Sequence, residues 1–202
     1  ANIAAIKYKQ FINNFPGRTY HFQPVLERLQ YVVPEIVGSA PFVILEGISD
    51  YYAFKTASIT CDIPIKFTIV PGVGSSALGN LISFLMGRDE KFIVLLDDDK
   101  AGRQERERYR KKYLLPDRLV ITYADIDTAY ETGALEFLVG EDSLRIVQDK
   151  LSLSTLPSKD QYGLYLAEQY HKAGARAGIF SPQGLENLHA VLRFLARQFE
   201  QS

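Results

Sequence analysis

Three consecutive carboxylates follow an apolar run in the middle of this chain. Residues 92–102 read FIVLLDDDKAG, so five apolar residues lead directly into Asp97, Asp98 and Asp99. A continuous apolar run of this length predicts a strand buried on both faces, as in a parallel sheet. Because side chains alternate along an extended segment, Asp97 and Asp99 can point the same way while Asp98 points elsewhere.

The pair Asp97 and Asp99 predicts a metal site. Two aligned carboxylates repel each other unless a positive charge lies between them. Mg²⁺, a hard cation that prefers oxygen ligands, would supply that charge, and Mn²⁺ or Ca²⁺ is expected to substitute in binding. The alternative is that Asp99 only caps the following helix and that the other acids are solvated.

A second acidic group follows an earlier apolar segment. The strand predicted at 42–46 ends in Glu46, and Gly47 and Asp50 come next. If this strand lies beside the strand that precedes Asp97, their carboxyl ends form the crevice where open α/β sheets bind ligands, and the acids converge there. Gly47 removes a side chain where a substrate could approach. Asp50 can either cap the next helix or add a metal ligand.

Strands and helices alternate from residue 41 to residue 123. This alternation predicts an α/β fold, with a small parallel sheet, right-handed crossovers and flanking helices. Strands are expected at 42–46, 66–70, 92–96 and 119–123, and helices at 49–58, 75–86 and 101–113. Beyond residue 123 the alternation stops, and helices are expected at 142–151, 159–173 and 182–199.

Three parts of the chain follow from this pattern. Residues 1–40 are expected to form an N-terminal helical lead-in, residues 41–140 a catalytic α/β domain, and residues 141–202 a helical C-terminal extension.

The 202 residues carry a formal net charge of −1, so no overall basic field indicates nucleic acid, although a local basic face can bind it. A single cysteine excludes an intrachain disulfide and a cysteine-rich zinc site, and favours a cytoplasmic setting. No apolar stretch is long enough to span a membrane.

The two acidic groups together resemble the Toprim domain. The matching motifs are Glu46-Gly47-x-x-Asp50 and Asp97-x-Asp99-x-Ala101-Gly102, each at the end of a predicted strand. Toprim domains occur in topoisomerases, bacterial primases and several nucleases. The resemblance implies a small Rossmann-like parallel sheet that binds Mg²⁺ through the Glu and the Asp-x-Asp pair. One cysteine cannot build a primase zinc module, and no topoisomerase tyrosine stands out among 12 tyrosines.

A narrower resemblance covers most of the chain and points to the nuclease part of the OLD (overcoming lysogenization defect) family. It rests on residues 71–74, 92–102 and 134–138. The resemblance implies that Glu136 is a further metal-site acid and that Lys159 is a catalytic lysine, although Lys159 can also be a solvated helix start. It also implies an ATPase domain in the full-length chain or in a partner, a role in phage defence and a possible homo-oligomer.

The chemistry that these resemblances imply is metal-dependent hydrolysis of a phosphodiester, as a DNA nickase or endonuclease. Two ions can stabilise the attacking and the leaving oxygens. Asp97 and Asp99 would hold one ion, and Glu46 would join them or act as general base. Glu136 and Asp50 would serve a second ion. An RNA-cleaving nuclease is the alternative within the same chemistry.

Other readings remain open. Residues 72–77 read GVGSSA, follow a predicted strand and fit a dinucleotide-binding fingerprint, with Asp97 20 residues further on. In a nuclease, Gly72 and Gly74 would instead lie against nucleic acid. The charged helix at 101–113 offers Arg103 as the first choice for a phosphate contact, whereas a solvated face with ordinary charge pairs is the usual explanation. A non-catalytic module that kept the fold is the last alternative.

Overall fold

The computed structural model describes four stretches of the chain, and all statements below refer to them. They are residues 41–72, 74–131, 133–171 and 178–200. The helical lead-in predicted for 1–40 lies outside the described residues, as do Val73 and the last two residues of the helix predicted at 159–173.

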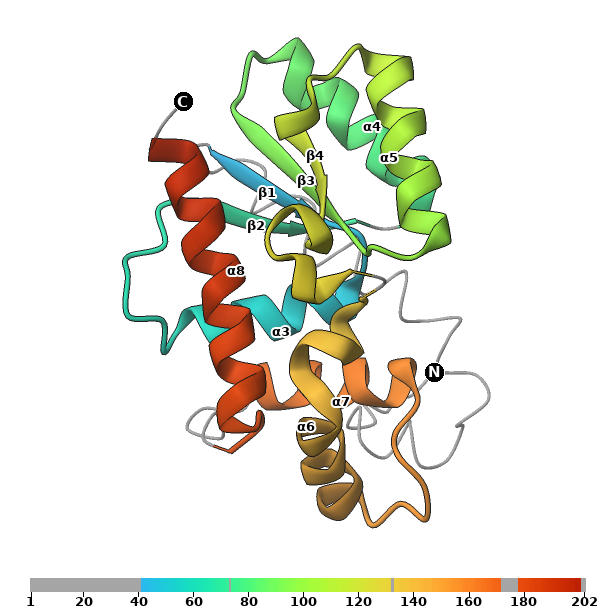
Figure 1. Ribbon diagram of the computed structural model, residues 1–202, viewed down its shortest axis with the longest axis vertical. Helices are drawn as coiled ribbons and strands as arrows, with labels where there is room; N and C mark the ends of the chain where they lie inside the picture. Colours follow the sequence, from blue (N-terminus) through green and yellow to red (C-terminus); the bar gives the residue numbers. More distant parts are fainter. Residues whose placement is uncertain (1–40, 73, 132, 172–177, 201–202) are drawn as a thin grey trace, which may run out of the picture. The chain divides into compact units, whose positions relative to one another are not determined.

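A parallel four-stranded sheet forms the centre of the described structure (Figure 1). Its strands are β1 (Phe42–Leu45), β2 (Thr68–Pro71), β3 (Phe92–Leu96) and β4 (Val120–Thr122). The strand order is β2-β1-β3-β4, with Leu45 of β1 in register with Leu95 of β3. The first and third strands are therefore neighbours, which is the condition on which the predicted meeting of their acids depended, and their carboxyl ends lie side by side.

Helices cover both faces of this sheet, which confirms the predicted α/β class. The first three described helices are α3 (Ile48–Ser58), α4 (Gly74–Gly87) and α5 (Lys100–Tyr113). Figure 1 shows α4 and α5 together on one face, where Ile82 and Leu85 of α4 pack with Ile44 and Val94 of the sheet. The other face is covered by α3. β1 and β3 are buried along their whole length because both of their faces meet helices.

The C-terminal part is helical, as predicted, and packs on the α3 side of the sheet (Figure 1). Its helices are α6 (Leu135–Leu151), α7 (Lys159–His171) and α8 (Pro182–Glu200). Three short 3₁₀ turns that the sequence did not reveal lie between α5 and α6, at Asp117–Leu119, Tyr123–Asp125 and Thr128–Tyr130. α6 runs across the expected boundary at 140/141, with a kink where Gly140 has a φ of 74°.

One close approach and two hydrogen-bond contacts hold these helices in place. Gly163 of α7 lies against Ser49 of α3, and an added Cβ would collide with the serine hydroxyl. The Ser181 amide before α8 donates a hydrogen bond of 2.9 Å to the hydroxyl of Ser143 on α6. His189 of α8 places its Nε2 3.1 Å from the carbonyl oxygen of Ala57 on α3. The C-terminal helices are thus joined to the α/β part within one unit, Ser39–Ser202.

No helix among the described residues combines the length and the apolar character that a membrane crossing requires.

We expect Gly163→Ala to destabilise the protein, because a methyl group there would also stand 3.1 Å from the Cβ of Ser49. Forcing α7 away from α3 should lower the free energy of unfolding by about 1–3 kcal/mol, as overpacking does. Gly87→Ala at the end of α4 is the matched control, since its methyl group meets no described atom within 4 Å. Urea unfolding of both variants measures the difference, and equal stability would contradict the close approach.

Candidate functional site

The carboxyl ends of β1 and β3 bring the two acidic groups together. Glu46 directly follows β1 and Asp97 directly follows β3. The backbone amide of Asp97 donates a hydrogen bond of 3.0 Å to Oε2 of Glu46. This contact follows from the parallel register, which places the ends of neighbouring strands at the same edge of the sheet.

Lys159 supplies the positive charge at this edge. It is the first residue of α7, and its Nζ lies 3.2 Å from Oδ2 of Asp97. The lysine side chain is half exposed, whereas the aspartate is buried. The packing of Gly163 on Ser49 explains this placement, because it fixes the first turn of α7 beside the start of α3.

Asp50 is the third acid of the site and lies in the first turn of α3. It is buried, and its Oδ1 accepts a hydrogen bond of 2.9 Å from the hydroxyl of Tyr123. The residue that begins the helix as N-cap is Gly47. The capping alternative for Asp50 is therefore wrong, because α3 begins earlier in the chain than the sequence pattern indicated.

Two buried carboxylate oxygens at this edge lack a hydrogen-bond donor. No described residue donates a hydrogen bond to Oδ2 of Asp50 or to Oδ1 of Asp97. Burial raises the pKa of Asp50 to about 6, while the charge of Lys159 acts to lower it. Burial, followed by the negative charges of Asp50 and Glu46, raises the pKa of Asp97 to about 7 despite Lys159. One ammonium does not offset so many acids.

Lys159 responds to the same charges in the opposite direction. Burial alone would lower the pKa of Lys159, but the nearby Asp50, Asp97 and Glu136 outweigh that effect and raise the pKa above its ordinary value. Glu136 lies in the first turn of α6, so its carboxylate belongs to the same electrostatic cluster. The nearby carboxylates therefore favour the charged form of Lys159.

The donor atoms of this cluster suit Mg²⁺, which prefers carboxylate oxygens. The unpartnered oxygens of Asp50 and Asp97 are the observation that favours a cation there. As they stand, however, no three His, Cys, Asp or Glu side chains of the described residues form a group that could hold a metal ion. The cation that the structure places among the acids is the ammonium of Lys159.

Asp99, which the sequence paired with Asp97, has surroundings of its own. Its side chain is exposed, and Oδ1 accepts a hydrogen bond of 2.7 Å from the amide of Gly102. Asp99 is thus the N-cap residue of α5, as the capping alternative predicted. Its other carboxylate oxygen takes no part in this cap.

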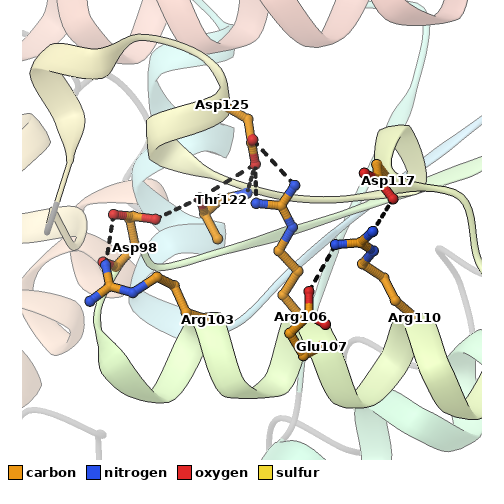
Figure 2. A network of polar contacts seen from close by, with 8 residues as sticks. All are labelled: Asp98, Arg103, Arg106, Glu107, Arg110, Asp117, Thr122 and Asp125. Atoms are coloured by element: carbon orange, nitrogen blue, oxygen red, sulfur yellow. Dashed lines mark hydrogen bonds and ion pairs between the residues drawn. The ribbon is translucent and has the colours of Figure 1, made fainter.

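Asp98 points away from the site, as the alternation predicted, and ties three elements together (Figure 2). Its Oδ1 accepts a hydrogen bond of 2.7 Å from the hydroxyl of Thr122, the last residue of β4. Its Oδ2 lies 2.9 Å from Nη1 of Arg103 on α5. The middle acid of the triplet is therefore a structural clamp.

The arginines of α5 are largely engaged with acids of this chain. Arg103 bonds to Asp98, Arg106 forms an ion pair of 2.8 Å with Asp125, and Arg110 pairs with Asp117 (Figure 2). These three side chains therefore agree with the usual explanation of such a charged helix, which is a solvated face with ordinary charge pairs. Arg103 remains half exposed and is the one nearest to Asp97 in the sequence.

The turn after β2 makes backbone contacts with the end of β1. The amide of Gly72 donates a hydrogen bond of 2.6 Å to the carbonyl of Leu45, and an added Cβ would meet the carbonyl oxygen of Glu46 at 2.8 Å. Gly74 is the first residue of α4. Because the amide of Gly72 is already used within the sheet, it is not available to a pyrophosphate, which weakens the dinucleotide-binding alternative.

Sequence reasoning missed Tyr123 as a member of the site. The tyrosine follows β4 directly, so it lies at the same edge of the sheet as Glu46 and Asp97. Its position after a strand was a usable signal, because the carboxyl ends of parallel strands share one edge.

Comparison of the chain with protein-family models, curated proteins and solved structures finds no match. The resemblance to Toprim domains and OLD nucleases therefore rests on the sequence motifs alone. The geometry described above does not depend on that resemblance.

We expect Asp98→Ala to lower the free energy of unfolding by about 1.5–3 kcal/mol, the range for a hydrogen bond to a charged group. The loss follows from the buried position of Asp98 and its bond to Thr122. Asp117→Ala removes an acid from the same network, but its pair with Arg110 is exposed and should contribute less than about 1 kcal/mol. Chemical denaturation of both variants is the measurement. A loss as small for Asp98 as for Asp117 would contradict the clamp.

We expect the site acids to make stability fall as pH rises in metal-free buffer. The unfolded chain releases their protons near the ordinary value of 3.8, whereas folded Asp50 and Asp97 hold them up to about 6 and 7. Between these values the folded state binds more protons, so rising pH favours unfolding. Asp97→Asn should therefore gain stability relative to wild type from about pH 4 to about pH 7, measured as the difference in Tm. A difference that stays constant would contradict the shift.

Proposed function

We propose that this chain hydrolyses phosphodiester bonds in nucleic acid, with the help of a divalent metal ion, at the carboxyl edge of β1 and β3. The observation that carries the proposal is the pair of buried, unpartnered carboxylate oxygens on Asp50 and Asp97, beside the charged Lys159. Buried polar atoms in folded proteins nearly always have a partner, so such oxygens call for a ligand.

Asp50 and Asp97 would hold the ion, Glu46 would join them or act as general base, and Asp99 and Glu136 would be the further carboxylates of the site. Bound Mg²⁺ would supply stabilisation of the negative charge that develops on the phosphate oxygens. All of these residues except Glu136 match the acids of the Toprim motifs, and Glu136 comes from the resemblance to the OLD family, which supports this chemistry over a purely structural cluster.

The residues of the chain have distinct tasks in the reaction. Glu46, if it is not engaged as a ligand, accepts the proton of the attacking water, whose oxygen forms a bond to phosphorus. The bond between phosphorus and the leaving sugar oxygen then breaks, and that oxygen takes a proton from solvent. Because the pKa of Lys159 is raised, the lysine contributes its positive charge to the phosphate oxygens and does not give up a proton.

DNA is the proposed substrate, and RNA is the alternative that the assay below separates. Affinity for nucleic acid comes mostly from the neutralisation of phosphates by lysine and arginine. Arg103, Arg106 and Arg110 of α5 are already paired with acids, and the formal net charge of the whole sequence is −1. We therefore infer that this chain alone binds nucleic acid weakly. We also infer that an ATPase domain of the full-length protein, or a partner, adds affinity.

We expect Glu46→Gln to lower metal-dependent cleavage at least about 100-fold, the low end of what general-base catalysis contributes. Asp97→Asn should also lower cleavage, because it removes a charged ligand of the ion. Glutamine can still accept the hydrogen bond from the amide of Asp97, so the fold should persist. Nicking of supercoiled plasmid, cleavage of linear duplex and cleavage of structured RNA, each in Mg²⁺, Mn²⁺ or chelator, measure the effect.

Two controls sharpen this assay. Asp117→Asn removes an exposed acid away from the site and should cleave like wild type. Asp99→Ser keeps an N-cap side chain for α5 but removes the carboxylate, so lost activity with a normal Tm would assign Asp99 to the metal. Wild-type cleavage that survives in chelator would overturn the metal dependence. No cleavage, together with tight binding of NAD, would favour the dinucleotide alternative.

A further inference from the structure

Tyr123 is joined to the acidic site by a buried hydrogen bond. Its ring is 1% exposed and stacks on Phe54 of α3, with 6.5 Å between the ring centroids. Its hydroxyl donates to Oδ1 of Asp50 across 2.9 Å. The bond connects the end of β4 to the first turn of α3, two elements that are 73 residues apart at this contact.

This bond gives the two oxygens of Asp50 different surroundings. Oδ1 is held by Tyr123, whereas Oδ2 has no hydrogen-bond partner among the described residues. The free oxygen lies against Gly47, because an added Cβ at Gly47 would stand 2.7 Å from it. Gly47 is the residue after Glu46, so the free oxygen of Asp50 is beside another acid of the site.

We propose that Tyr123 and Gly47 are positioning residues that present Oδ2 of Asp50 to the divalent ion of the proposed nuclease site. The inference rests on the proposed function and adds two residues that act through Asp50. Tyr123 fixes the rotation of the carboxylate by holding one oxygen, and Gly47 places no side chain against the other, buried oxygen.

Packing alone does not explain either residue. Phenylalanine would fill the space of Tyr123 and keep the stack on Phe54, so only the hydroxyl requires tyrosine at this position. Gly47 has φ −125° and ψ 164°, an extended conformation that alanine adopts without strain. The backbone therefore does not require glycine there, and the close oxygen of Asp50 does.

The test uses Tyr123→Phe and Gly47→Ala in the whole chain, with Tyr109→Phe as the matched control. Tyr109 is equally buried, but its hydroxyl contacts Arg108 on α5 rather than a site acid. Calorimetric titration of the metal-free proteins with Mn²⁺ measures affinity directly. We expect binding about 10- to 100-fold weaker in each site variant, the usual effect of losing a group that orients a ligand. The control should bind like wild type.

Kinetics and a double-mutant cycle separate positioning from general damage. Plasmid nicking should show a lower kcat for Tyr123→Phe with an unchanged KM for DNA, since the tyrosine is buried and does not contact the substrate. In the Asp50→Ala background, Tyr123→Phe should weaken Mn²⁺ binding no further, because its effect runs through Asp50.

The outcomes are distinct. Wild-type affinity in both Tyr123→Phe and Gly47→Ala would overturn the positioning roles and leave the proposed function intact. Equal losses in Tyr109→Phe would also overturn them, as would a full additional loss in the Asp50→Ala background. If Tyr123→Phe fails to fold, Gly47→Ala alone decides the matter. A wild-type protein that neither binds Mn²⁺ nor cleaves would overturn the proposed function, and this inference with it.

Discussion

The ion pair between Lys159 and Asp97 is the interaction on which the arrangement of the site depends. It joins the end of a buried central strand to the first residue of α7, across 62 residues of sequence. Without a cation, the gathered carboxylates would repel one another and favour a looser structure. The lysine therefore allows the fold to keep buried acids at the sheet edge, and the close packing of α7 on α3 keeps the lysine in reach.

The buried acids of the site work against stability. The pKa values of Asp50 and Asp97 are raised because burial disfavours their charged forms, and the lysine offsets this only in part. Groups arranged in this way are typical of functional sites, where activity rather than stability determines the residue. Asp98 and Asp99 differ from them, because both carboxylate oxygens of Asp98 have partners and Asp99 is exposed. Within one triplet, Asp97 pairs with Lys159, Asp98 joins β4 to α5, and Asp99 caps α5.

Much of the fold could be predicted because each element depends on local pattern. The buried run before Asp97 is the strand β3, and the regular spacing of apolar residues after residue 159 is the helix α7. Boundaries were less certain where a polar residue had two possible roles. Asp50 is a residue type that caps helices, but the N-cap of α3 is Gly47, so Asp50 lies inside the first turn of the helix.

The sequence determined that Glu46 and Asp97 each follow a strand, and it predicted that they meet if the two strands are neighbours, because parallel neighbours end at one edge of the sheet. The strand order of the structure meets that condition. Only the tertiary structure decided which other groups join them. Lys159 reaches Asp97 because α7 packs on α3, and Tyr123 reaches Asp50 from its position directly after β4. The residues next to Lys159 and Tyr123 in the sequence do not predict these partners. The reason is physical. Strands and helices are predicted from periodicity along the chain, whereas a contact between distant side chains depends on how these elements pack.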